Sequence, residues 1–454
     1  MESKEYIQDM VQKSRTAQRE FEKFNQQQVD AAVRAIAKTI YDHAEELARL
    51  AVDETRMGVY EDKIKKNQGK SRIIWNSLKN KKSVGIIRRD PLTGITEVAR
   101  PVGVVGAVTP CTNPIVTPMC NAMFALKGRN SMIIAPHPRA RKCAQRVTEL
   151  FQEALLPLGT PENLIQVIAE PTVELTNELM KAADVSVATG GMGMVKAAYS
   201  SGKPAFGVGA GNVQCIIDQG YDLQTAIPKI IAGRIFDNGI ICSGEQTIII
   251  HEDDYAAAIN ALQKNGALVI RESADRDRLR AALFVDGVMN KNLVGQSVAR
   301  VAETAGLALP AGARVIAVEA EGCGTADLLS KEKMCPVITL FTYKTFAQAV
   351  EIAVANLQVE GKGHSISIHS DHAENIEYAA QVVPVSRVLI NQICSTMNGG
   401  SFNNGLAPTT TLGCGSWGNN SISENLDYKH LLNITRIGYY LPDAQVPTDA
   451  EIWG

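Results

Sequence analysis

One cysteine in the chain stands in a setting that suits covalent catalysis. Cys242 follows the apolar pair Ile240 and Ile241 in the segment F-D-N-G-I-I-C-S-G-E-Q at 236–246, and an apolar run that predicts a strand comes soon after it. A thiol held at the end of such a loop can meet a ligand and attack an electrophilic carbon as the thiolate. For a cysteine taken alone, burial in the core is the more common fate.

The cysteines as a group carry no further pattern. The nine in the chain are scattered without C-x-x-C pairs and without histidines at zinc spacing. This distribution argues against a disulfide framework and against a structural metal site. We therefore expect core positions for most cysteines, chemistry at one or two, and no bound metal.

The charge balance narrows the partners to small molecules. The 46 basic and 48 acidic side chains are mixed throughout and leave a formal net charge of -2, so no overall field favours nucleic acid or an anionic membrane. The basic stretch from Lys79 is interpreted as a solvated helix end followed by a strand. The first residues lack the pattern of a signal peptide and no apolar run reaches membrane-spanning length, so a cytoplasmic protein is expected.

Two α/β domains are expected to position the thiol, because 454 residues are too many for one core. Apolar residues recur at helical spacing from Lys4 to about Leu78. Beyond this helical layer, short apolar runs alternate with helical segments, and the runs begin at Val102, Ser131, Ile165 and Val185. Such alternation is typical of an open parallel sheet that binds its ligand beyond the carboxyl ends of the strands, as in a dinucleotide-binding domain.

A second alternating series predicts another α/β domain from about Pro228 to Gln392, and the stretch from Gly399 predicts a loop followed by a helix and a strand. The predicted domains are 1–227 for the helical layer and the dinucleotide domain, 228–398 for the thiol domain, and 399–454 for a C-terminal segment that returns to the first domain.

Six segments keep an order and spacing that chance does not explain. They are T-P-C-T-N-P-I-V-T-P at 109–118, A-P-H-P-R-A at 135–140, A-T-G-G at 188–191, G-V-G-A-G-N at 207–212, F-D-N-G-I-I-C at 236–242 and K-E-K-M-C-P-V at 331–337. Together they resemble the CoA-acylating branch of the aldehyde dehydrogenase superfamily. The resemblance implies an α/β fold in which a Rossmann-type dinucleotide-binding domain joins an α/β catalytic domain and a C-terminal oligomerisation segment. It also implies a homodimer or a dimer of dimers.

Within that branch the strongest likeness is to dehydrogenases of succinate semialdehyde, through M-C-N-A-M, S-F-N-N-G and T-L-G-C-G-S-W-G-N-N-S-I-S-E-N. Acylating enzymes for sulfoacetaldehyde, or for the short-chain acetaldehyde and butyraldehyde, stay open as alternatives. A hydrolytic aldehyde dehydrogenase and a non-catalytic scaffold are further alternatives, although a scaffold would need neither Cys242 nor Asn113.

The resemblance implies a covalent mechanism. Cys242 as thiolate would attack the aldehyde carbon, and the family's asparagine in T-x-x-x-N-P, here Asn113, would form an oxyanion hole with the backbone N–H of Cys242. The alternative for Asn113 is a turn residue before Pro114.

By the same resemblance, the thiohemiacetal would pass a hydride to the nicotinamide and become a thioester on Cys242, and the fate of that thioester depends on Gly207. Hydrolytic relatives carry a glutamate base in a segment of the form E-L-G-G-K, and Gly207 in G-V-G-A-G-N stands in its place. Without that base a thiol such as coenzyme A, with a pKa of about 8.5, takes the acyl group more easily than water does. We therefore expect coenzyme A as co-substrate. The alternative for Gly207 is a loop glycine that permits a positive φ.

The resemblance also implies NADP or NAD as the cofactor. Glu332 would bond the nicotinamide ribose, with Pro336 shaping the loop behind it. Arg139 could accept a 2′-phosphate as a fork donor, which favours NADP. The helix after Gly191 could face the pyrophosphate with its N-terminal N–H groups. The other residues assigned to the cofactor site are Thr109, Pro110, Pro136, His137, Thr189, Gly190 and Gly209.

The segment G-C-G-S-W-G at 413–418 matches the dinucleotide fingerprint in its letters only. No apolar strand precedes it and no apolar helix follows it, so we expect backbone packing near the substrate entrance instead.

Four residues are assigned to the substrate or to coenzyme A. His364 in G-K-G-H-S matches a histidine of the acylating branch and could assist coenzyme A or the thioester, and a structural histidine is an equal alternative. The tail of an anionic aldehyde needs a positive or multidonor pocket. Ser243, Ser365 and Arg387 are candidates by their positions in the chain.

Overall fold

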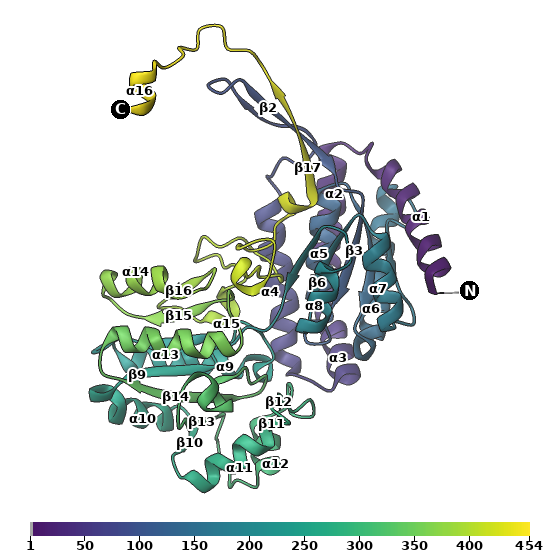
Figure 1. Ribbon diagram of the computed structural model, residues 1–454. Coiled ribbons are helices and arrows are strands. Elements are labelled where there is room, and N and C mark those ends of the chain that lie inside the picture. The colour runs from purple at the N-terminus through teal and green to yellow at the C-terminus, as the bar shows by residue number, and fades with distance from the viewer. Residues whose placement is uncertain (1–2) are drawn as a thin grey trace.

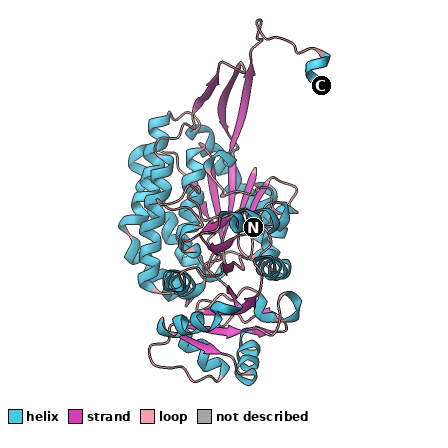
Figure 2. Ribbon diagram, turned by 90° about the vertical axis from the view of Figure 1, so that its left-hand side faces the viewer, coloured by secondary structure: helices cyan, strands magenta, loops and turns pink. Residues whose placement is uncertain are grey.

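The computed structural model describes residues 3–454. Two parallel sheets, each with helices packed on it, form the body, and a three-stranded antiparallel arm projects from one end (Figures 1 and 2). The predicted α/β class is confirmed. Within the described part of the chain, no helix has both the length and the apolar character needed to cross a membrane.

Four helices form the predicted N-terminal layer: α1 (Ser3–Phe21), α2 (Gln26–Asp42), α3 (Ala44–Thr55) and α4 (Tyr60–Leu78). A capping box begins α2, because Asn25 accepts from the backbone N–H of Gln28 and the Gln28 side chain accepts from that of Asn25. The buried faces of α2, α3 and α4 share one apolar core with helices of the first sheet. This packing fixes α4 beside the first domain.

The first sheet is parallel throughout, in the order β5-β4-β3-β6-β7. Its strands are β3 (Val104–Thr109), β4 (Ser131–Pro136), β5 (Ile165–Val167), β6 (Val185–Thr189) and β7 (Ala205–Val208), and its helices are α5 (Val116–Lys127), α6 (Arg141–Leu155), α7 (Val173–Ala182) and α8 (Met192–Tyr199). Every residue of α5 is buried. Because these strands run parallel, the carboxyl ends of β3, β4 and β6 lie at the same end of the sheet, as in a dinucleotide-binding domain.

The second sheet is also parallel, in the order β10-β13-β14-β9-β8-β15-β16. Its strands are β8 (Gln214–Ile217), β9 (Thr247–His251), β10 (Ala267–Ile270), β13 (Val315–Glu319), β14 (Val337–Tyr343), β15 (Ile366–His369) and β16 (Val388–Ile390). Its helices are α9 (Leu223–Ile235), α10 (Tyr255–Lys264), α11 (Ser273–Leu283), α12 (Val298–Ala305), α13 (Phe346–Val359), α14 (Ala373–Val382) and the short α15 (Cys394–Met397). A small hairpin, β11 (Phe284–Val285) and β12 (Val288–Met289), lies beside them.

The chain enters the second sheet before residue 227, where the sequence placed the boundary. Strand β8 belongs to the second sheet, where it pairs with β9 on one side and with β15 on the other. Its residues are buried, so their backbone N–H and C=O groups need these partners. Pro228, which suggested the boundary, lies inside α9.

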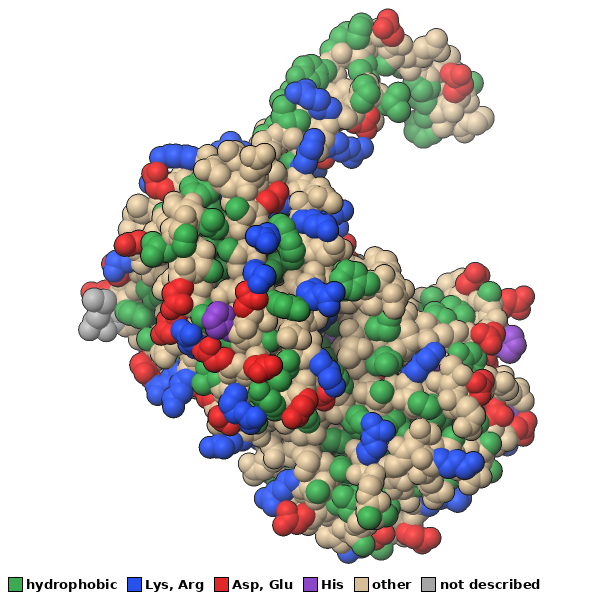
Figure 3. Space-filling view, turned by 180° about the vertical axis from the view of Figure 1, so that it is seen from behind, with side chains coloured by type: hydrophobic (Ala, Val, Ile, Leu, Met, Phe, Trp, Pro, Cys, Tyr) green, Lys and Arg blue, Asp and Glu red, His purple; other side chains and the backbone are tan. Residues whose placement is uncertain are grey.

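The arm joins distant parts of the chain. Strands β1 (Gly85–Asp90), β2 (Ile95–Pro101) and β17 (Leu432–Gly438) pair antiparallel, and α16 (Asp449–Trp453) follows at the C-terminus. The helix expected before β17 is only a 3-10 turn at Tyr428–Leu431. Apolar side chains lie uncovered along the arm, with Leu92 89% and Tyr440 88% exposed (Figure 3).

Candidate active site

Three consecutive residues with left-handed backbone lead into the thiol. Asp237, Asn238 and Gly239 have φ values of 51°, 53° and 70°. Aspartate and asparagine tolerate this region better than most residues, and glycine adopts it freely. At Gly239 an added Cβ would also overlap the guanidinium group of the buried Arg234. The D-N-G segment thus serves the backbone path that ends at Cys242.

The N-terminal part of α4 holds this loop. The buried carboxylate of Asp237 accepts from the backbone N–H of Val59 at 2.8 Å and from Lys63 Nζ at 3.1 Å, and it forms a second ion pair with Lys66. Asp62 Oδ2 in turn accepts from the backbone N–H of Asp237 at 2.9 Å. Burial alone would raise the pKa of Asp237, but the charges of Lys66 and Lys63 hold this pKa below its ordinary value.

Asn113 lies between β3 and α5 and lines the same cavity as Cys242. Its Oδ1 accepts a hydrogen bond from Lys66 Nζ at 2.7 Å. A lysine can only donate, so this bond orients the amide and leaves its Nδ2 group for a ligand. Within residues 3–454, neither this Nδ2 group nor the backbone N–H of Cys242 donates a hydrogen bond. Two free donors therefore lie at the thiol's cavity, as an oxyanion hole requires.

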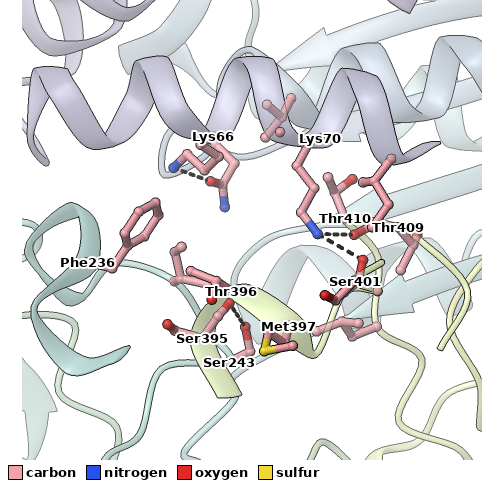
Figure 4. Close-up of a pocket in the computed structure, with 18 of the residues that line it drawn as sticks. Lys66, Lys70, Phe236, Ser243, Ser395, Thr396, Met397, Ser401, Thr409 and Thr410 are labelled. Carbon is pink, nitrogen blue, oxygen red and sulfur yellow. Dashed lines mark hydrogen bonds between the residues drawn. The ribbon is translucent and has the colours of Figure 1, made fainter. Parts of the chain in front are cut away.

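A cavity of about 440 Å³ gives access to the thiol. Lys66 and Lys70 project from α4 along one wall, and Ser243, Ser395 and Thr396 lie on the opposite side (Figure 4). The cavity is lined by both domains and by the loop after α15. Its volume suits a small substrate such as a short aldehyde.

Lys70 brings an ammonium group without a carboxylate partner to this cavity. Its Nζ donates to the carbonyl oxygen of Gly399 at 2.8 Å and to that of Thr409 at 3.3 Å. No ion pair of Lys70 occurs in the described part of the chain. Burial lowers the pKa of Lys70 to about 8. Since a desolvated cation is stabilised by an anion, this group fits a negatively charged substrate.

The G-A-G-N loop runs directly behind the nucleophile. An added Cβ at Gly211 would overlap the carbonyl oxygen of Cys242, so only glycine permits this approach. The backbone N–H of Gly211 donates to Glu332 Oε1 at 3.1 Å. Glu332 is buried, and burial raises its pKa to about 7. The carboxylate assigned to the nicotinamide ribose therefore sits next to the thiol loop.

The thiol itself is protonated at neutral pH before a substrate binds. Burial first, and then the nearby carboxylate of Glu332, raise the pKa of Cys242 to about 12, although Arg387 opposes the shift. Formation of the thiolate must therefore be coupled to substrate binding or to the attack.

This pKa predicts how the free thiol reacts. The rate of alkylation of Cys242 by iodoacetamide should rise about tenfold per pH unit from pH 7 to 10, because the thiolate fraction grows in that proportion below the pKa. Labelling of the Cys242 peptide, followed by mass spectrometry, measures this rate. A plateau between pH 7 and 9 would contradict the prediction.

Gly207 is needed for packing and not for an unusual backbone angle. It lies in strand β7 and does not have a positive φ, so the alternative based on φ is wrong. An added Cβ would lie 2.7 Å from Val195 Cγ1 and 3.1 Å from Tyr199 Cε2. The position where hydrolytic relatives carry a glutamate therefore has no room for a side chain.

The edge of the first sheet has the features that a dinucleotide needs. Thr109 and Pro136 end β3 and β4 as paired neighbours, and Pro110 follows, all three buried. Gly190 and Gly191 have open space where a Cβ would stand, so a ligand can approach the N-terminus of α8 after Thr189. At Gly209 a Cβ would overlap the Met192 sulfur. The residues at this edge fit a nicotinamide dinucleotide.

His137 and Arg139 lie exposed beyond β4. His137 Nδ1 accepts from the backbone N–H of Arg139 at 3.1 Å, and Arg139 Nη2 donates to the carbonyl oxygen of Thr55 at 2.9 Å. The guanidinium keeps further donors for a phosphate. The carboxylate of Glu54 accepts hydrogen bonds from the backbone N–H groups of Lys142 and Cys143 at 2.8 Å, so it caps the N-terminus of α6.

Three residues assigned to the substrate do not line the cavity. The guanidinium group of Arg387 donates hydrogen bonds to Ser365 Oγ at 3.1 Å, to the His364 carbonyl oxygen at 2.8 Å and to Asn425 Oδ1 at 3.3 Å. The tail-binding role predicted for Ser365 and Arg387 is not supported, because this buried network leaves them no open side. Ser243 does line the cavity, with its hydroxyl donating to the Ser395 carbonyl oxygen at 2.9 Å.

His364 is fully buried, and neither ring nitrogen has a hydrogen-bond partner in the described part of the chain. Burial lowers its pKa well below the ordinary value, so the ring is neutral. Pro336 is buried just before β14, beyond the loop that carries Glu332. These positions leave the roles predicted for both residues open.

The segment at 413–418 forms a 3-10 turn at Ser416–Gly418 between loops, and no strand–turn–helix unit. Leu412 and Cys414 pack with Val208 and Cys242 in one small cluster. The segment therefore walls the thiol and makes no dinucleotide fingerprint.

Three residues that the structure places at the site had no role predicted from the sequence: Lys66, Lys70 and Asp237. A signal was available in K-I-K-K-N-Q-G-K, where Lys63, Lys66 and Lys70 follow at helical spacing and share one face of a helix. Lys63 and Lys66 on that face are buried and Lys70 is partly exposed, whereas buried helix faces are usually apolar.

A cysteine at a cavity beside an amide donor, next to a sheet edge fit for a dinucleotide, defines an aldehyde-oxidising enzyme of the thiol-dependent class. Residues 1–284 match the model of the aldehyde dehydrogenase family. The chain belongs to this family.

Named relatives narrow the class. The succinate-semialdehyde dehydrogenase (acetylating) of Clostridium kluyveri is 53% identical over 99% of both chains. The sulfoacetaldehyde dehydrogenase of an Acholeplasma species is 38% identical over 99% of this chain and 93% of its own. The crystal structure of an acetylating aldehyde dehydrogenase from Geobacillus thermoglucosidasius has a TM-score of 0.93 and 36% identity over 98% of both chains. The predicted membership of the acylating branch is confirmed.

Proposed function

We propose that this chain interconverts succinate semialdehyde and succinyl-CoA through a thioester on Cys242, with NADP or NAD as redox partner. The observation that carries the proposal is the contrast at the thiol. Two free donors lie at the cavity of Cys242, whereas Gly207, at the position of the hydrolytic base, has no room for a side chain.

In the oxidative direction Cys242 loses its thiol proton to solvent, its sulfur bonds to the aldehyde carbon, and the carbonyl electron pair moves onto oxygen. The Nδ2 group of Asn113 and the backbone N–H of Cys242 stabilise that charge as it forms. A bound nicotinamide cofactor supplies the hydride acceptor that turns the adduct into a thioester. The loop of Gly211 and the carboxylate of Glu332 support the thiol from behind.

Coenzyme A completes the reaction. Its sulfur bonds to the thioester carbon, the bond from that carbon to Cys242 breaks, and the enzyme thiol is regenerated. Water is a poor competitor because a water nucleophile needs a general base, and Gly207 stands at the position of that base with the side chains of Val195 and Tyr199 packed against it.

An anionic aldehyde suits the cavity because of Lys70. Its ammonium group has two carbonyl partners and a third N–H, and it lines the cavity with Cys242. A carboxylate would give it the counter-ion that it lacks. The 53% identity to the Clostridium kluyveri enzyme favours succinate semialdehyde, and sulfoacetaldehyde is the second candidate because a sulfonate would also satisfy Lys70.

The substrate is tested by comparing CoA-dependent rates for succinate semialdehyde, sulfoacetaldehyde, acetaldehyde and butyraldehyde with each nicotinamide cofactor. Succinate semialdehyde should have the highest kcat/KM. A dominant alkyl aldehyde would refute the anionic tail.

Arg139→Ala should lower the preference for NADP over NAD, since the guanidinium group of Arg139 is the proposed partner of the 2′-phosphate.

We also propose that a second copy covers the apolar arm formed by β1, β2 and β17. Exposed apolar groups lie at the turn and the strand end of this arm, such as Leu92 between β1 and β2 and Tyr439 and Tyr440 just after β17, and the sheet has unpaired edges. Sedimentation velocity should therefore give a dimer or a tetramer, and a monomer at micromolar concentration would contradict this.

A further inference from the structure

One lysine connects the thiol loop to the oxyanion donor. Lys66 Nζ donates to Asn113 Oδ1 at 2.7 Å and also pairs with the carboxylate of Asp237, which lies five residues before Cys242. The Lys66 side chain is 8% exposed and that of Asp237 is fully buried. Two parts of the site that come from different domains thus meet at one ammonium group.

The bond to Asn113 decides which end of the amide faces the cavity. The oxygen and the nitrogen of an asparagine side chain have nearly the same shape, so packing alone does not select between the two orientations. The hydrogen bond from Lys66 Nζ to Asn113 Oδ1 selects the orientation in which Oδ1 faces the lysine. If the amide were reversed, its oxygen would face the developing oxyanion and repel it. The bond also polarises the amide, which strengthens its Nδ2–H groups as donors.

Charge adds to this effect. The groups around Lys66 are the carboxylate of Asp237, the ammonium of Lys63 on the same helix, the ammonium of Lys70 one turn further, and the neutral amide of Asn113. With Lys63 and Lys66 charged, two cations share the single carboxylate of Asp237. The excess positive charge lies next to the amide that meets the oxyanion.

We infer that Lys66 is a positioning residue of the oxyanion hole: it turns the Nδ2 group of Asn113 to the cavity and ties that amide to the thiol loop through Asp237. The inference rests on the proposed thioester chemistry at Cys242. Lys66 acts on the oxyanion through Asn113, whose Oδ1 it binds.

A double-mutant cycle tests this role. Asn113→Ala should lower kcat/KM about 10²- to 10³-fold, the usual loss on removing one oxyanion donor. Lys66→Met should lower it about 10- to 100-fold in the parent protein, but less than about threefold in the Asn113→Ala background, because its effect passes through the missing amide. Equal losses in the two backgrounds would overturn the inference.

Lys63 provides the matched control, since it pairs with the same Asp237 at 3.1 Å but makes no bond to Asn113. Lys63→Met should cost less than Lys66→Met, and its loss should persist in the Asn113→Ala background. Alkylation of Cys242 by iodoacetamide forms no oxyanion, so Lys66→Met should change that rate less than about threefold. A large fall in alkylation, or the same result for both lysines, would mean that Lys66 only supports the thiol loop.

Lys66→Gln keeps a donor for Asn113 Oδ1 and should retain more activity than Lys66→Met. If Lys66→Met does not fold, Lys66→Gln is carried through the same cycle, where it should show a smaller loss that again vanishes in the Asn113→Ala background. All variants are compared in cofactor reduction, which precedes the choice between coenzyme A and water. A failure of the proposed function would appear in the unsubstituted protein, as turnover that needs no coenzyme A.

Discussion

Replacing Cys242 by serine is expected to lower kcat about 10⁴-fold or more while the protein stays folded, because a hydroxyl is a far weaker nucleophile than a thiol and forms no thioester. The side chains have nearly the same size, so the packing against Val208, Leu412 and Cys414 is kept. Cofactor reduction measures the activity, and circular dichroism measures the fold.

The matched control is Cys323→Ser. Cys323 is also partly exposed, but it packs against the far side of the second sheet and does not line the cavity. It should keep the parent rate. Activity retained in Cys242→Ser, or lost equally in both variants, would move the nucleophile away from Cys242.

Replacing Lys70 by methionine is expected to lower kcat/KM for succinate semialdehyde about 10²- to 10³-fold, because a desolvated carboxylate would lose its charged partner. The loss should appear mainly in KM, since the tail does not take part in bond formation. Butyraldehyde carries no charge, so its kcat/KM should change little or improve. The ratio of the two values before and after the substitution is the measurement.

Lys65→Met serves as control for Lys70. Lys65 lines the same cavity, but its side chain is 71% exposed and pairs with Asp62.

The pH dependence of KM is a second test of the role proposed for Lys70. With a pKa of about 8 in the free protein, Lys70 loses its charge as the pH rises, so KM for succinate semialdehyde should increase above pH 8 while KM for butyraldehyde stays constant. A pH-independent KM ratio would remove Lys70 from tail recognition.

The sequence predicted the parts of the site that lie in local motifs. Cys242 and Asn113 are recognisable because a nucleophile and its donor each need particular neighbours, D-N-G before the thiol and proline after the amide. The α/β class also follows from the alternating apolar runs, since each run is a buried strand.

Contacts between distant segments could not be predicted in the same way. Arg387 looked free for a substrate, yet Ser365 and Asn425 use its donors, and nothing in the chain order shows that these three meet. Lys70 had no predicted role, but its ammonium group donates to the carbonyl oxygens of Gly399 and Thr409, more than three hundred residues away. The boundary near residue 227 is wrong because β8 (Gln214–Ile217) precedes it in the chain but pairs with β9 and β15 of the second sheet.

These contacts give α4 a larger role than its sequence indicates. It pairs with Asp237 of the thiol loop, it donates a hydrogen bond to the Asn113 amide, and it brings the ammonium group of Lys70 to the cavity. The N-terminal helical layer is therefore part of the site and not only a scaffold for the first sheet.

The most direct test of the account is a single-turnover experiment with and without coenzyme A. Without it, succinate semialdehyde and the oxidised cofactor should give one equivalent of reduced cofactor per chain and then stall, with a succinyl group found on the Cys242 peptide by mass spectrometry. Added coenzyme A should release this group as succinyl-CoA and restore steady turnover. Continuous formation of free succinate without coenzyme A, at the rate seen with it, would contradict the account.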